Sequence, residues 1–112
     1  MSLRQTFAPS GPTVLVGTTA VQVPGTTSVP GCYRVRNLSS SVAYFTMGNS
    51  SSVTAQAAPS AGTPSPNTIG MLPNSVETFG NPFGGVDVNS PVAAYFISAN
   101  AAAFEVTPGE GP

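Results

Sequence analysis

The sequence has very little charge. Three Arg and four acidic residues are its only charged side chains, 6% of 112 residues, against about 25% in an average globular protein. With three Arg and a net charge of −1, the chain cannot neutralise many phosphates, so we expect no nucleic-acid partner. The same shortage excludes a polybasic membrane patch, and no apolar run approaches the ~20 residues that span a bilayer. We therefore expect no membrane partner, and Met1–Gln5 lacks the apolar stretch of a signal peptide.

The chain also has no His and only one Cys. Without His there is no ordinary general base near neutral pH, no Ser–His or Cys–His pair and no imidazole ligand for a metal. We therefore predict a non-enzymatic protein with no catalytic residues, no metal and no cofactor. Cys32 cannot form an intramolecular disulfide, which fits synthesis in a reducing cytoplasm. We interpret it as a small, partly buried apolar side chain; the alternative is a thiolate activated by Arg34.

The acidic residues are scattered along the sequence. Glu77 and Glu105 fall on separate predicted strands, Asp87 lies in a loop, and Glu110 lies near the end. A glycosidase needs two carboxyl groups held close together. We therefore predict exposed carboxylates that keep the protein soluble, not an acid pair.

Proline and strand-like alternation predict an all-β fold. Twelve Pro residues leave few gaps long enough for a helix. Alternating apolar residues with turn residues every 8–12 positions are typical of a β-sandwich or barrel. We predict a single-domain antiparallel β-sandwich with strands at 13–16, 21–23, 32–37, 42–47, 68–72, 75–79, 92–98 and 103–107.

The strands leave three segments outside the sandwich. Residues 1–12 form a predicted N-terminal extension, 108–112 a C-terminal tail, and 50–66 a long flexible loop within the 13–107 domain. We expect two hairpins. One joins the strands at 32–37 and 42–47, and the other joins those at 92–98 and 103–107 about Asn100.

Two kinds of residue are candidates for partner binding. Arg34 and Arg36 alternate with Tyr33 and Val35, so both guanidinium groups lie on one strand face. They are either a solvated face or anchors for carboxylates of a partner.

Adjacent aromatic residues supply the second kind of candidate. Tyr44 precedes Phe45, and Tyr95 precedes Phe96, so aromatic rings lie on both faces of their strands. Either two layers enclose these strands or one set of rings meets a partner. We assign Phe45 and Tyr95 to the core and Tyr44 and Phe96 to a partner surface, and we expect a homo-oligomer, dimer or trimer.

Four segments resemble a pattern in small tailed-bacteriophage virion proteins. They are Tyr33–Asn37, Ala43–Asn49, Leu72–Phe79 and the ending 93–111, which closes on Thr-Pro-Gly-Glu-Gly. The resemblance implies a jelly-roll-like sandwich that binds the outer head shell as a decoration or cement protein.

The resemblance also implies where the protein acts and with which partner. Its partner would be the major capsid protein, and its location would be the virion after synthesis in the host cytoplasm. A neck or tail component is an alternative. A carbohydrate-binding or host-adhesion module is another, although the absence of Trp counts against it.

Overall fold

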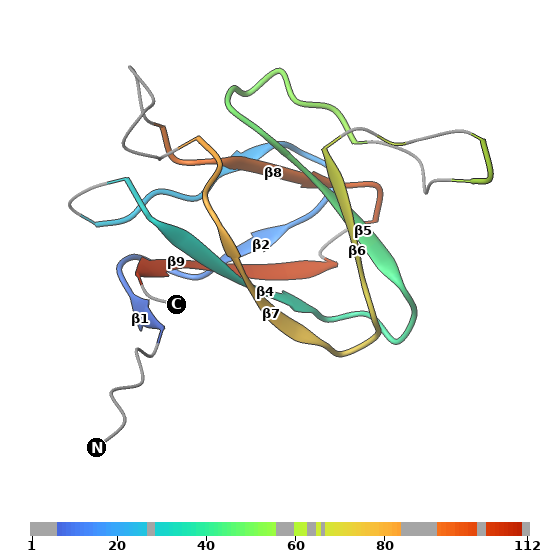
Figure 1. Cartoon of the computed structure of the whole chain (residues 1–112), viewed down its shortest axis with the longest axis horizontal. Coiled ribbons are helices and arrows are strands. Elements are labelled where there is room, and N and C mark those ends of the chain that lie inside the picture. The colour runs from blue at the N-terminus through green and yellow to red at the C-terminus, as the bar shows by residue number, and fades with distance from the viewer. Residues whose placement is uncertain are drawn as a thin grey trace.

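The described part of the chain is built from β-strands. The structure, a computed structural model, describes residues 7–26, 29–55, 60–62, 65, 67–83, 92–100 and 103–110 (Figure 1). Within these residues it has no helix, and the strands are β1 (Ala8–Pro9), β2 (Val14–Val16), β3 (Val21–Gln22), β4 (Cys32–Asn37), β5 (Ala43–Gly48), β6 (Thr68–Met71), β7 (Val76–Gly80), β8 (Tyr95–Ser98) and β9 (Phe104–Glu110). The predicted all-β fold is confirmed. The described residues therefore contain no membrane-spanning helix.

The strands form two antiparallel sheets packed together. Sheet A has the order β2-β9-β4-β7, and β1 pairs with the end of β9 on the same edge as β2. Sheet B has the order β3-β8-β5-β6. From β2 to β9, each connection except β5–β6 passes from one sheet to the other. Two four-stranded sheets connected in this way form a jelly roll, so the predicted jelly-roll-like sandwich is confirmed.

Both predicted hairpins are wrong. The strand at 32–37 is β4 of sheet A, whereas the strand at 42–47 corresponds to β5 of sheet B. In the same way, β8 lies in sheet B and β9 in sheet A. Turn residues show that the chain reverses, but they do not show whether the next strand pairs with the previous one or crosses the core. The apolar faces that the two sheets bury together decide that choice.

Aromatic side chains fill the space between the sheets. Tyr33 and Phe104 come from sheet A, Phe45 and Phe96 come from sheet B, and none of the four is exposed. The ring centroids of Tyr33 and Phe96 are 5.0 Å apart and those of Phe45 and Phe104 are 5.2 Å apart, both edge to face. Aromatic quadrupoles favour this arrangement. The inner faces of the sheets therefore form one continuous aromatic core.

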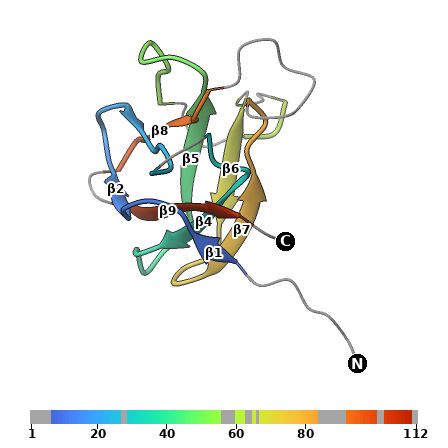
Figure 2. The ribbon, with the colours of Figure 1, turned by 90° about the vertical axis from the view of Figure 1, so that its left-hand side faces the viewer.

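The two ends of the described chain belong to sheet A. Figure 2 shows β1 beside the end of β9, and the Ser10 N–H donates a hydrogen bond of 2.9 Å to the Pro108 carbonyl. Residues 8–9 of the predicted extension and 108–110 of the predicted tail are thus strand residues of sheet A. Their pairing joins opposite ends of the sequence, so it leaves no local pattern from which it could be predicted.

The predicted loop at 50–66 begins by folding back onto sheet B. Val53 packs above Gly48, where a Cβ would lie 2.7 Å from the Val53 Cβ. The Val53 N–H donates a 3.2 Å hydrogen bond to the Ser50 carbonyl. This first part of the loop is therefore in contact with the sandwich. Residues 56–59, 63–64 and 66 lie outside the described residues, and their flexibility stays a prediction.

Candidate functional site

The outer face of sheet A carries two rows of side chains that run across the strands. The register places the first row, one residue from each of β2, β9, β4 and β7, in the order Leu15, Glu105, Arg36 and Val76. The neighbouring row is Thr13, Thr107, Arg34 and Thr78. We call these eight residues the sheet A surface. All of them are exposed or half-buried, so this face is open to a partner.

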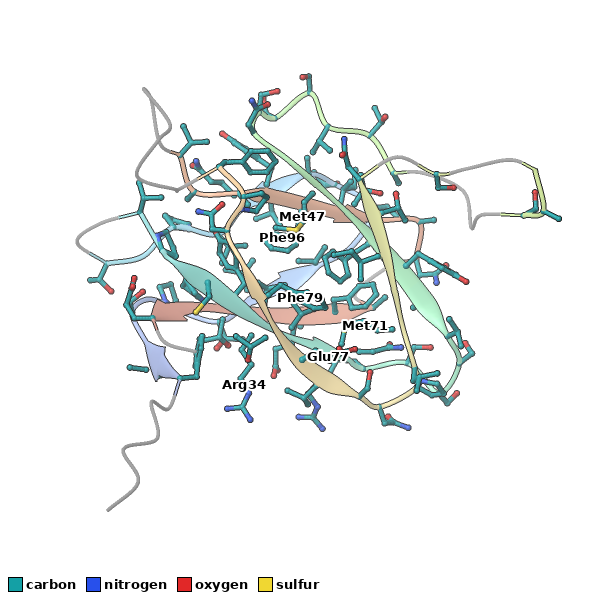
Figure 3. The ribbon with its side chains drawn as sticks, in the orientation of Figure 1. Arg34, Met47, Met71, Glu77, Phe79 and Phe96 are labelled. Carbon is teal, nitrogen blue, oxygen red and sulfur yellow. The ribbon has the colours of Figure 1, made fainter. Side chains whose placement is uncertain are left out.

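Arg34 and Arg36 lie on this surface as the alternation predicts. Tyr33 and Val35, which alternate with the two arginines, are fully buried, and Figure 3 shows Arg34 pointing away from the sandwich. Neither guanidinium makes an ion pair or a hydrogen bond within the described part of the chain. An open depression of about 320 Å³ is lined by Arg34, Arg36, Asn74, Val76, Glu105 and Thr107. Both cations are thus available to acceptors that another molecule supplies.

A second exposed region lies on two adjacent loops at one end of the sandwich. Leu38 and Val42 flank the β4–β5 loop, and Leu72 begins the β6–β7 turn. Their side chains are 38%, 48% and 68% exposed, respectively. We call these three residues the apolar loop end. Exposed apolar side chains gathered in this way are typical of an interaction surface.

Buried Asn37 holds these two loops together. Its side-chain amide donates to the carbonyls of Ser41, Met71 and Leu72 at 3.0–3.1 Å. Its side-chain oxygen accepts a 2.9 Å hydrogen bond from the Ser39 N–H. The apolar loop end is therefore fixed in shape before any partner binds.

Asn81 plays the same part at the opposite end of the sandwich. Its side-chain amide donates to the carbonyls of Pro30 and Val92 at 2.9 and 3.1 Å, and its side-chain oxygen accepts from the Phe83 N–H at 3.0 Å. Sequence reasoning missed the role of both asparagines. An Asn at the end of a strand or directly after it is the one local signal that could have suggested this role, because Asn side chains satisfy loop backbone groups.

Tyr44 lies on the outer face of sheet B, as predicted. It is half-buried, and its ring covers Gly70 of the neighbouring strand, where a Cβ would collide with the ring. Part of the ring is therefore used within the chain, and the rest is open to contact.

The assignment of Phe96 to a partner surface is wrong. Phe96 is fully buried against Tyr33, whereas Tyr95, predicted to lie in the core, is half-buried on the outer face of sheet B. In an alternating strand the sequence shows that the two rings lie on opposite faces, but it does not show which face is inside. The pairing of Val21 with Phe96 places Phe96 inside.

Cys32 fits the interpretation as a buried small side chain. Its thiol donates a 3.5 Å hydrogen bond to the Gly109 carbonyl. Burial, and secondarily the charge of Glu110, raises the pKa of the Cys32 thiol. A raised pKa opposes the reactive thiolate form, which disfavours the alternative of an activated nucleophile.

Glu77 and Glu105 do not form an acid pair. Glu77 lies opposite Val35, which faces the core, and Glu105 lies opposite Arg36, which faces outward. The two carboxylates are therefore directed to different sides of sheet A. No group of His, Cys, Asp or Glu suited to a metal occurs in the described ranges, and Asp87 lies outside them.

Comparison of the chain with protein-family models, with curated proteins and with solved structures found no match.

Proposed function

We propose that the chain is a structural virion protein of a tailed bacteriophage. It binds the major capsid protein on the outer head lattice, on the virion surface, and stabilises the head as a decoration or cement protein. It has no enzymatic role and needs no cofactor. After synthesis in the host cytoplasm it joins particles as a homo-oligomer.

The observation that carries this proposal is the jelly-roll strand order of a chain that resembles phage head proteins in sequence. Jelly rolls occur in viral capsid and lectin domains. A fold alone does not fix a function, so the features of the surface matter as well. The described residues offer an open, nearly uncharged exterior with a preformed apolar loop end. Such a surface supports adhesion and not a reaction.

The apolar loop end is the surface that we assign to the capsid. Leu38, Val42 and Leu72 present apolar side chains on loops that Asn37 fixes in place. A rigid contact surface loses little conformational entropy on binding. Many such contacts, repeated by the symmetry of the lattice, give strong attachment even when each is weak.

Deletion of the gene from the phage that encodes the chain tests the function. We expect heads of normal shape that rupture at a lower temperature and regain resistance when the purified protein is added, because binding to the assembled lattice stabilises it. Unchanged heat resistance, or labelled protein found only at the neck or tail, contradicts the proposal. Loss of host attachment with intact heads supports the adhesion alternative instead.

A variant of the contact surface tests the assignment of the apolar loop end. Leu38→Ser, Val42→Ser and Leu72→Ser combined remove the exposed apolar groups but leave Asn37 in place. We expect this variant to fold and to lose sedimentation with capsids, whereas Ala61→Ser, at an exposed position of the β5–β6 loop, binds as the wild type does. Full binding by the triple variant contradicts the assignment.

A further inference from the structure

The first row of the sheet A surface has complementary halves. Leu15, Glu105, Arg36 and Val76 follow one another on adjacent strands. Read from either end, the row is apolar, charged, charged, apolar. Its two central charges have opposite sign, so reversing the row exchanges the acid with the base and one apolar group with the other.

We infer that the sheet A surface is an interface with a second copy of this chain. A twofold axis that runs along the strands, between β9 and β4, turns one copy onto the other face to face. It places Glu105 of each copy opposite Arg36 of the partner and Leu15 opposite the partner's Val76. Interfaces of this isologous kind are the commonest in homo-oligomers.

The same twofold axis also gives compatible contacts in the second row. Arg34 of one copy then lies opposite Thr107 of the other, and Thr13 lies opposite Thr78. Hydroxyl and backbone oxygens are suitable acceptors for a guanidinium, and no like charges oppose each other in either row. Neither Arg34 nor Arg36 has an ion pair within the described part of the chain. No ion pair there has to break before the arginines contact the second copy.

Several features favour a second copy over an unrelated partner. The chain is poor in charge, and yet Arg36 and Glu105 occupy the two central positions of one row. Leu15 and Val76, at 60% and 44% exposed, are the apolar groups at the two ends of that row. An acidic partner would be repelled by Glu105, whereas a second copy pairs with both charges.

The geometry also gives the dimer a direction. Because the axis runs along the strands, the apolar loop ends of both copies emerge on the same side. If the proposed attachment to a capsid is correct, the dimer therefore attaches through two sites at once. This consequence rests on the proposed function, whereas the dimer itself does not.

Two charge reversals in separate chains test the interface. Arg36→Glu places two acids opposite each other in a dimer, and Glu105→Arg places two bases there. We expect the wild type to dimerise in sedimentation velocity and each variant to dissociate with a Kd raised roughly tenfold or more, since like charges across an interface are strongly unfavourable. An equimolar mixture of the two variants restores opposite charges at both contacts, so we expect mixed dimers in native mass spectrometry.

The mixture separates the interface from effects within one chain. Arg36 and Glu105 are also neighbours in the same sheet, and any loss that arises there persists in the mixture. Restored dimers therefore support the inference, and monomers in the mixture overturn it. A wild type that stays monomeric at high concentration also overturns it, whatever the outcome of capsid binding.

Disulfide trapping supplies a second test that needs no charge reversal. The two ends of the row lie about 14 Å apart, three strand spacings of about 4.8 Å. In the proposed dimer Leu15→Cys in one chain meets Val76→Cys in the other. We expect oxidation of a mixture of these two variants to give a covalent heterodimer, and oxidation of either variant alone to give none at these positions. Equal cross-linking in the single variants, or none in the mixture, contradicts the arrangement.

Discussion

Among the single residues, the two buried asparagines show how polar groups organise this fold. Asn37 is fully buried and Asn81 nearly so, and the side-chain amide of each donates hydrogen bonds to backbone carbonyls of two or more separate segments. A buried polar group without a partner is strongly unfavourable. Each asparagine therefore stabilises the sandwich through the loops that it holds and not through apolar contact.

Replacement of Asn37 tests this role. Asn37→Ala removes the hydrogen bonds to three carbonyl groups and the acceptor of the Ser39 N–H, although the carbonyls of Leu72 and Ser41 keep hydrogen bonds from Ser75 and Ser39. We expect the free energy of unfolding to fall by about 2–4 kcal/mol, because four hydrogen bonds are lost at roughly 0.5–1.5 kcal/mol each. Urea denaturation measures it, and Asn49→Ala, at an exposed position, is the matched control. A loss equal to that of the control contradicts the role.

The buried hydroxyl of Tyr33 makes stability depend on pH. Burial raises the pKa of Tyr33 to about 12, partly offset by the hydrogen bond from the Ala94 N–H. The neutral form is favoured in the folded state. The unfolded chain therefore releases the proton near pH 10, while the folded chain keeps it until about pH 12. The stabilisation is complete below pH 10 and is lost as the pH rises through this window.

Denaturation between pH 8 and 12 measures this effect. We expect the free energy of unfolding to decrease by about 2–3 kcal/mol across the window through Tyr33. Tyr33→Phe removes the titrating group, so its curve has a smaller slope even though its absolute stability is lower. Parallel curves for the wild type and the variant contradict the prediction. Cys32, whose pKa is also raised, contributes equally to both curves.

At the scale of elements, β8 separates a core ring from a surface ring. Phe96→Ala removes a fully buried ring that contacts Tyr33 and Phe45. We expect it to lower the free energy of unfolding by about 3–5 kcal/mol, as in other cores. Tyr95→Ala, next to it on the outer face, changes stability by about 1 kcal/mol or less. Equal losses in chemical denaturation contradict the assignment of faces.

The strands show which parts of the fold the sequence determines locally. The alternation in β4 correctly predicts that Tyr33 and Val35 are buried and that Arg34 and Arg36 are exposed. The β6–β7 turn is also local, since Pro73 favours its second position and Asn74, with φ of 57°, tolerates its third. Pattern and turn chemistry act over a few residues, and both are visible in the sequence.

Pairing between distant segments could not be predicted in this way. Three features depend on which distant segments pair with each other. They are the pairing of β1 with β9, the crossing of most connections from one sheet to the other, and the position of Glu105 opposite Arg36. The candidate surface shows the same division. Sequence alternation placed both arginines on one face, but only the strand order brought Leu15, Glu105 and Val76 beside them.

On the scale of the whole molecule, the N-terminal strand covers a part of sheet A that would otherwise be open. Cys32 lies on the same side of β4 as Arg34 and Arg36, yet it is only 6% exposed. Its neighbour across the strands is Gly109, and the ring of Phe7 packs directly on Gly109. The segment that contains Phe7 and β1 therefore closes this corner of the sheet.

Deletion of residues 1–9 tests this closure through the reactivity of Cys32 toward a disulfide reagent. In the full chain the thiol reacts slowly, since it is buried and its pKa is raised. We expect the deletion to accelerate the reaction by roughly tenfold or more while the sandwich stays folded, because local exposure needs less free energy than global unfolding. Phe7→Ala, which keeps the backbone of β1, gives a smaller acceleration.

Urea denaturation of each variant gives its unfolded fraction. If the rates rise only in proportion to that fraction, the thiol is reached by global unfolding and β1 does not act as a local cover.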